Sequence, residues 1–163
     1  MSAASDQQYV TFGVEDEVFA APVAMVREIL DYGEPFKIPQ GPPYLLGLTD
    51  VRGRGVPLVD LRTRFGLPRA APTPQTRILV LDVPFEGRML ELGLVADRVF
   101  EVASFSSDQI GAAPDIGVQW KSDYISGVVR REDGFVVLID LARLFGTEDV
   151  VALAAASGLE RAA

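Results

Sequence analysis

Two twenty-residue segments of this chain, 47–66 and 127–146, align without a gap, each residue of the first pairing with the residue 80 positions later. The first reads GLTDVRGRGVPLVDLRTRFG and the second GVVRREDGFVVLIDLARLFG, with seven identical positions. A weaker repeat, at an offset of 73, links Val26, Glu28 and Ile29 to Val99, Glu101 and Val102. The chain therefore contains an internal duplication, and its fold must accommodate the same pattern twice.

The first half of the chain has the residue pattern of short strands joined by turns. Apolar and polar residues alternate over 9–23, which predicts a β-hairpin. Pro22 predicts a short helical turn over 22–30, because its missing N–H costs nothing at the first helical position. Two further strands are predicted on either side of residues 52–55 (Arg-Gly-Arg-Gly), where glycines supply the positive φ angles of a tight turn.

The second half follows the same order. A strand pair is predicted around a turn at Glu86–Gly87, and residues 106–123 are predicted to form a long loop with a helical turn beginning at Ser107. After the second copy of the repeat, residues 147–158 predict a helix with Thr147 as its N-cap.

Many short strands separated by turns predict an all-β protein with short helices. The duplication predicts two small barrels side by side, sharing an apolar interface because each half, near eighty residues, would be marginally stable alone. We expect these boundaries: a flexible tail over 1–8, a domain over 9–151 with halves of roughly 9–70 and 77–146, and a C-terminal helix and tail over 147–163.

Positions kept in both halves are expected to be required by the fold. Asp60 and Asp140 each follow an apolar strand and precede Leu-x-x-x-Phe-Gly, so each carboxylate is expected to cap a short helix. Gly66 and Gly146 stand where such a helix would end in a left-handed residue. We interpret all four residues as structural, and the two aspartates not as a catalytic pair.

The turn inside the repeat differs between the halves. Arg52 aligns with Glu132 and Gly53 with Asp133. Closing a barrel does not require Arg52, which makes it a functional candidate; the alternative is an ordinary solvated turn. Nearby basic residues predict either a positive surface for an acidic protein or plain solvated surface: Arg52, Arg54, Arg62, Arg64 and Arg69.

Composition argues against several functional classes. The chain has no histidine and no cysteine, which removes imidazole and thiolate chemistry, and its carboxylates lack metal-ligand spacing. A net charge of −8 argues against nucleic acid or an anionic membrane surface as a partner. Lys121 and Tyr124 are expected to face solvent. A small enzyme or ligand-binding barrel would require a buried, polar-lined cavity.

The residues also resemble a known family. IPQGPPYLLGLTDVRGRGVPLVDLRTRFG is similar to the signature of the CheW family of bacterial chemosensory adaptors, in which Gly-hydrophobic-x-Asn-Leu-Arg-Gly precedes a strand ending Pro-hydrophobic-hydrophobic-Asp-Leu. VREI, LGLVADRVFEV and GFVVLIDLARLF resemble further elements of the family in the same order. The resemblance extends from about Tyr9 to about Val151.

This resemblance implies two five-stranded SH3-like barrels packed around a shared core, and a cytoplasmic, non-catalytic role without cofactor or metal. Family members couple the cytoplasmic tip of chemoreceptors to the regulatory domain of a CheA-type histidine kinase. By resemblance, the receptor-binding groove comprises Val26 and Glu28 in the helical turn, with Gly47, Asp50, Arg52 and Gly53 around the arginine turn.

The family asparagine is Asp50 in this chain. A carboxylate two residues from Arg52 can either pair with it and reduce its reach toward a partner, or select a receptor with different charges. Asp50 therefore motivates an alternative, a divergent adaptor that binds a different kinase or regulator in a non-motility pathway.

Overall fold

The computed structural model describes residues 6–39, 41–85, 87–111, 124–132, 134–145, 152, 153 and 155. Its strands are β1 Gln7–Val14, β2 Glu17–Pro22, β3 Val26–Asp31, β4 Leu45–Val51, β5 Arg54–Asp60, β6 Arg77–Phe85, β7 Arg88–Ala96, β8 Arg98–Phe105, β9 Ile110–Gly111, β10 Ile125–Arg131 and β11 Gly134–Ile139. Its helices are single turns: the 3-10 turns η1 Val23–Met25 and η2 Ser107–Gln109, and the α-helices α1 Leu61–Arg64 and α2 Leu141–Leu144.

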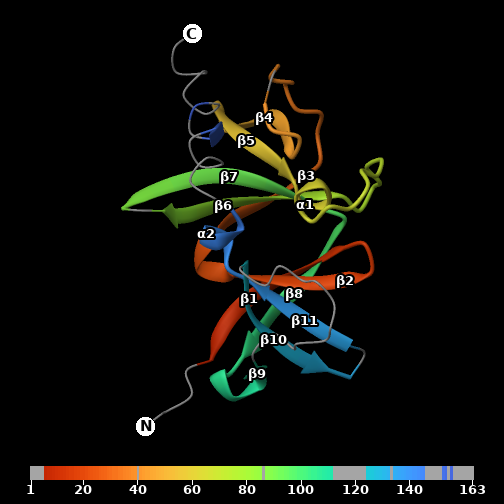
Figure 1. The fold of residues 1–163 in the computed structure, drawn as a ribbon, viewed down its shortest axis with the longest axis vertical. Coiled ribbons are helices and arrows are strands. Elements are labelled where there is room, and N and C mark those ends of the chain that lie inside the picture. The colour runs from red at the N-terminus through yellow and green to blue at the C-terminus, as the bar shows by residue number, and fades with distance from the viewer. Residues whose placement is uncertain are drawn as a thin grey trace.

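The strands form two sheets stacked along the long axis of the molecule (Figure 1). One has the order β8-β1-β2-β11-β10-β9 and the other β3-β6-β7-β5-β4. Each sheet curls on itself. We refer to the sheet β8-β1-β2-β11-β10-β9 as barrel A and to the sheet β3-β6-β7-β5-β4 as barrel B. The predicted all-β class with short helices is confirmed, with a two-residue β9 added to the five expected strands of barrel A.

The barrels do not coincide with the sequence halves. Barrel A combines the N-terminal hairpin β1–β2 with β8–β11, and barrel B combines β3–β5 with the hairpin β6–β7. Each barrel therefore takes one hairpin from one half and its other strands from the other half. The parallel pairs β5·β7 and β2·β11 join the two contributions. This corrects the simple picture of one barrel per half.

The strand registers confirm the duplication residue by residue. Gly47 pairs with Leu58 and Gly127 with Leu138, each directly after a register shift in its strand. The weaker repeat lies on an edge strand in each barrel, and both edge strands carry a bulge. In β3 the register shifts between Val26 and Glu28. In β8 it shifts opposite residues Val10 to Phe12 of β1. Both offsets seen in the sequence thus correspond to equivalent places in three dimensions.

The predicted capping residues lie where they were expected. Asp60 is the N-cap of α1 and its carboxylate accepts the backbone N–H of Arg62, while the Asp140 carboxylate accepts that of Arg143 at the start of α2. Gly66 has φ +78°, and α1 ends with two backbone bonds, from Gly66 to Thr63 and from Leu67 to Arg62, that form a Schellman motif. Gly146 lies outside the described residues.

The buried apolar side chains of the described residues form three clusters: one in each barrel and a larger one that both barrels share. In the shared cluster, Phe65 stacks on Tyr124 with ring centroids 5.4 Å apart, and Phe145 packs on Tyr44 at 6.0 Å. These two contacts are related by the duplication, since each phenylalanine meets the tyrosine of the other half. Tyr124 is thus half-buried, and burial raises its pKa; the expectation that it faces solvent was wrong.

Two other expectations about segments are corrected. The helical turn over 22–30 is limited to η1, and the chain continues as β3, because residues 26–31 alternate between half-buried and exposed positions as a strand does. β1 begins at Gln7, inside the predicted tail. The C-terminal helix lies almost wholly outside the described residues; Leu153, which is described, is buried in the shared cluster.

An ionic network joins the barrels where the chain crosses from β7 to β8 at Asp97. Arg62, which follows β5, donates from Nε and Nη2 to Asp97 at 3.0 and 2.7 Å, and its Nη1 lies 3.1 Å from the Glu15 carboxylate in the β1–β2 turn. The Glu15 backbone N–H, held at a positive φ of 55°, also donates to Asp97. One guanidinium therefore contacts both barrels and the crossing between them.

Candidate partner-binding site

The two residues expected in a helical turn, Val26 and Glu28, lie instead on β3, the edge strand of barrel B. Val26 is half-buried and packs against the shared cluster. Glu28 follows the bulge, and its side chain keeps 23% exposure at the open end of the barrel. The strand, rather than a helix, determines which way each side chain points.

The arginine turn is a two-residue hairpin between Val51 and Arg54. Arg52 has φ +53° and Gly53 φ +83°, the pair of positive angles that a type I′ turn requires. Gly55, expected to take part in the turn, belongs to β5 and pairs with Asp50. An arginine rarely adopts a positive φ, so the hairpin holds the Arg52 side chain in one fixed direction at its tip.

The structure brings Arg52 and Glu28 together from opposite edges of the barrel B sheet. Arg52 Nε lies 3.2 Å from Glu28 Oε2, and Nη2 lies 3.5 Å from Oε1. The hydrogen bond that Arg52 donates to the Glu28 carboxylate, followed by the negative charge of Glu28, raises the pKa of Arg52. The arginine side chain is 77% exposed, so its guanidinium is accessible to another protein while it spans the open end of the barrel.

The recurrence of Glu28 as Glu101 has a structural explanation. In barrel A, Glu101 on the edge strand β8 lies 4.0 Å from Arg131 on the facing β10–β11 hairpin. Each glutamate therefore reaches from an edge strand to an arginine of the opposite hairpin. Glu28 has a role in joining the sheet edges in addition to any role in binding.

Gly47 belongs to the packing of β4 rather than to the exposed tip. It is buried, with φ +144°, and a Cβ built on it would lie 1.9 Å from the carbonyl oxygen of Phe36. That close approach allows Phe36 and Leu48 to exchange two backbone hydrogen bonds of 2.8 Å. At Gly127 a Cβ would lie 2.5 Å from the Ile110 side chain and 3.2 Å from the Gly111 carbonyl oxygen of β9, so both halves have a close contact at this glycine.

Asp50 is engaged in the turn and does not pair with Arg52. Its Oδ1 accepts the backbone N–H of Gly53 at 2.9 Å. An asparagine side-chain oxygen would accept the same hydrogen bond, so the difference from the family pattern preserves the turn.

We therefore expect Asp50→Asn to change the free energy of unfolding by less than about 0.5 kcal/mol, and Asp50→Ala to lower it by about 1 kcal/mol through loss of one turn hydrogen bond. Urea unfolding of the two variants and the parent chain measures both effects. A loss as large for asparagine as for alanine would show that the charge, rather than the acceptor, stabilises the turn.

Sequence reasoning missed an ionic row next to this turn. Arg27 lies 3.4 Å from Asp82 and 3.3 Å from Glu91, and Glu91 lies 2.9 Å from Arg54. The row crosses β3, β6, β7 and β5 in their order in the sheet. In β3 the side chains alternate between half-buried and exposed, which places Arg27 and the 41% exposed Ile29 on the outer face. The residue types of VREILD do not alternate in this way, so the sequence carried no local signal for the row.

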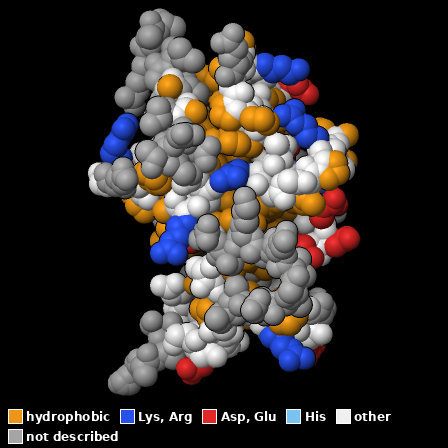
Figure 2. Space-filling model, viewed as in Figure 1, with side chains coloured by type: hydrophobic (Ala, Val, Ile, Leu, Met, Phe, Trp, Pro, Cys, Tyr) orange, Lys and Arg blue, Asp and Glu red, His pale blue; other side chains and the backbone are white. Residues whose placement is uncertain are grey.

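The expected basic surface is not continuous. Arg52, Arg54 and Arg62 pair with carboxylates, while Arg64 and Arg69 donate to the backbone carbonyls of Leu144 and Pro43. Basic side chains accordingly form separate spots on the face shown in Figure 2. Of the five arginines, Arg52 keeps the largest exposure among those with carboxylate partners.

Other kinds of site were sought in the described part of the chain. There, acidic residues form no group that could hold a metal ion, and no helix has the length and apolarity needed to cross a membrane. A cavity of about 520 Å³ opens to solvent at the end of barrel A rather than being enclosed.

Comparison with known proteins identifies the fold and its family. The CheW-like domain matches residues 8–149. The chain belongs to this family. Its relatives include the chemotaxis protein CheW of Klebsiella aerogenes, 28% identical over 144 residues that cover 88% of this chain and 84% of the relative. Another is the chemotaxis protein CheW of Bacillus subtilis, 30% identical over 135 residues that cover 82% of this chain and 83% of the relative.

The fold of this CheW-like chain also matches a solved structure. The scaffolding protein TtCheW from Thermoanaerobacter tengcongensis superimposes with a TM-score of 0.77 at 24% identity, covering 89% of this chain and 91% of that protein. The expected architecture of two SH3-like barrels around a shared core is therefore confirmed. The resemblance stated from the sequence motifs is confirmed by the family match.

Proposed function

We propose that this CheW-like protein is a cytoplasmic, non-catalytic adaptor that holds the tip of a chemoreceptor against the regulatory domain of a CheA-type histidine kinase. The family match over residues 8–149 is the observation that carries the proposal. The chemotaxis proteins among its relatives support the same role. No catalytic step, cofactor or metal is part of it.

The mechanism depends on one body with fixed faces. The hairpin exchange and the shared cluster make each barrel depend on strands from both halves, so the barrels keep a defined relative orientation. A receptor bound to one face and a kinase bound to another are then held at a constant angle. Small movements of the receptor can therefore bias the conformational equilibrium of the kinase.

The receptor contact is proposed at β3 and the arginine turn. Arg52 offers a planar fork of donors, of which only Nε and Nη2 are directed at Glu28. A carboxylate or carbonyl on a receptor helix can compete with Glu28 or bind beside it. Because the Arg52 side chain is 77% exposed, a partner acceptor can approach its guanidinium with little desolvation of the arginine.

The divergent-adaptor alternative depended on Asp50 interfering with Arg52. Asp50 accepts the Gly53 N–H and Arg52 pairs with Glu28, so the reading in which Asp50 pairs with Arg52 no longer supports that alternative. The receptor and kinase classes named here are therefore the ones to test first.

Arg52→Ala is expected to weaken binding of a receptor-tip fragment at least about tenfold, because interface arginines are frequent binding hot spots. Its urea unfolding midpoint should remain close to that of the parent, since exposed ion pairs contribute little to stability. Isothermal titration with the receptor fragment, and separately with a kinase regulatory domain, measures the affinities.

Arg77→Ala is the matched control, because Arg77 also forms a surface ion pair on barrel B, 3.6 Å from Asp31. It should bind both partners as the parent does. Equal receptor binding by Arg52→Ala and the parent would remove Arg52 from the site. Folded parent protein that binds neither partner would overturn the adaptor function.

A further inference from the structure

Each barrel has an open end beside one of the two duplicated hairpins, β4–β5 in barrel B and β10–β11 in barrel A. These two ends are related by the duplication but differ in charge. In barrel B, Arg52 and Arg54 of the β4–β5 hairpin meet Glu28 on β3 and Glu91 on β7. The strand registers place four residues of barrel A at the corresponding positions: Glu132, Gly134, Glu101 and Val18. Both arginines are thus replaced, one by a glutamate and one by a glycine.

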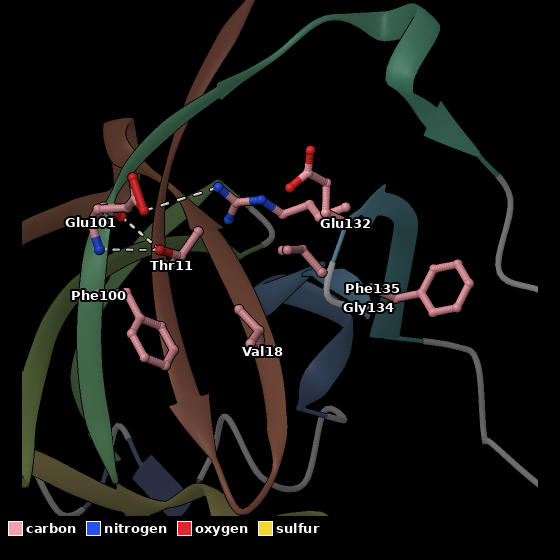
Figure 3. Close-up of a pocket in the computed structure, with 9 residues that line it drawn as sticks. Thr11, Val18, Phe100, Glu101, Glu132, Gly134 and Phe135 are labelled. Carbon is pink, nitrogen blue, oxygen red and sulfur yellow. Dashed lines mark hydrogen bonds and ion pairs between the residues drawn. The ribbon is translucent and has the colours of Figure 1, made fainter.

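The cavity of about 520 Å³ lies at this end of barrel A (Figure 3). Its volume is in the range of ordinary binding pockets. Val18 and Val136 supply apolar contact, and Thr11 is fixed beside them by a 2.8 Å hydrogen bond from its hydroxyl to the Glu101 carbonyl. Phe100 and Phe135 stand on opposite sides, 48% and 51% exposed. The cavity therefore occurs where barrel B has two guanidinium groups.

Among the residues that line the cavity, the carboxylates outnumber the guanidinium groups. Arg131 reaches Glu101 only at 4.0 Å and also lies over the Phe105 ring. Among the residues that the structure describes, Glu132 has no ion-pair partner, and Figure 3 shows its carboxylate on the same side of the cavity as that of Glu101. The cavity is thus lined by two carboxylates and one guanidinium, while Arg98, which lies over the Phe100 ring at 5.3 Å, donates to the Glu15 carbonyl oxygen.

We propose that this end of barrel A binds an arginine side chain presented by a partner protein. Glu132 and Glu101 would accept hydrogen bonds from the guanidinium, as Glu28 and Glu91 do within barrel B. Val18 and Val136 would contact the methylene stem, and an apolar residue next to the arginine would pack on an exposed phenylalanine. This site lies on the other barrel from the proposed receptor contact and does not depend on it.

The test uses the isotope-labelled full chain and the peptide acetyl-Leu-Arg-amide, followed by amide chemical shifts. The control peptide carries citrulline, a neutral isostere of arginine. We expect shifts centred on β8 and the β10–β11 hairpin, with half-saturation at ~1 mM, as expected for so small a ligand. The citrulline peptide should bind at least about tenfold more weakly, because it lacks the charge.

Two variants locate the site. Glu132→Gln should weaken binding of the arginine peptide at least about fivefold, because it removes one charged acceptor. Glu132→Arg should abolish binding, because the new guanidinium can reach Glu101 as Arg52 reaches Glu28, and the variant should remain folded. The proposal is overturned if both peptides bind equally, if the shifts lie elsewhere, or if neither variant changes the affinity.

Discussion

Gly47→Ala is expected to lower the free energy of unfolding by about 4 kcal/mol, because the added methyl cannot fit against the Phe36 carbonyl and φ +144° disfavours any side chain. Relieving the clash requires Phe36 to move away from β4, which breaks its two backbone hydrogen bonds with Leu48 at about 1 kcal/mol each. The backbone strain adds about 1–3 kcal/mol. Urea unfolding at equilibrium measures the loss.

Gly53→Ala is the matched control, since it also has a positive φ, +83°, but a Cβ there meets nothing within 4 Å. It should cost only about 1–2 kcal/mol, the penalty of a left-handed residue without a clash. Equal losses in the two variants would mean that backbone conformation alone explains Gly47, and that the approach of Phe36 contributes nothing.

Local signals explain what could be predicted from the sequence. Asp60 and Gly66 act through hydrogen bonds within a few residues, so a short pattern was enough to place the cap and the end of α1. The hairpins were predictable for the same reason, because their turns and alternating strands are contiguous. The comparison of halves singled out Arg52, and the structure places it at an exposed tip.

Long-range pairing explains what could not be predicted. The parallel pairs β5·β7 and β2·β11 join strands from different halves, and neither strand carries a local signal for its partner. A repeat in sequence therefore indicates that two similar barrels exist without indicating which strands build each one. The same limit applies to the site, where Glu28 meets Arg52 across the sheet rather than along the chain.

The error over residues 22–30 arose because pairing with a distant strand overrode the local sequence signal. Pro22 correctly predicted a helical start, but only the three residues of η1 follow it. From Val26 onward the alternation of half-buried and exposed residues has the period of a strand. Pairing with β6 then determines the outcome, because an edge strand gains backbone hydrogen bonds that a single helical turn would forgo.

Arg62→Ala is expected to lower the free energy of unfolding by about 2–3 kcal/mol, because it leaves the carboxylates of Asp97 and Glu15 without their shared guanidinium. The side chains of Arg62 and Asp97 keep 15% and 23% exposure, so this ion pair is not fully buried. The loss of stability should therefore lie at or below the lower end of the range found when a buried ion pair is broken. Arg143→Ala is the control, since its 74% exposed ion pair with Asp140 should contribute less than about 1 kcal/mol.

The same network predicts a pH dependence with a definite sign. Burial acts to raise the pKa of Asp97, but hydrogen bonds from Arg62 and from the Glu15 N–H, together with the charges of Arg62 and Arg98, lower it below its ordinary value of 3.8. The folded state therefore binds this proton less readily than the unfolded state. Its stabilising contribution is fully present above the ordinary pKa and is lost as the pH falls through the lowered one.

Urea unfolding of the parent and of Asp97→Asn from pH 7 to about pH 2.5 isolates this contribution from that of the other carboxylates. The parent should be more stable at neutral pH, and its advantage should shrink below about pH 4 as Asp97 becomes protonated. An advantage that stays constant over the whole range would show that Asp97 stabilises the crossing through its shape and not its charge. The two barrels would then be joined at this point by packing alone.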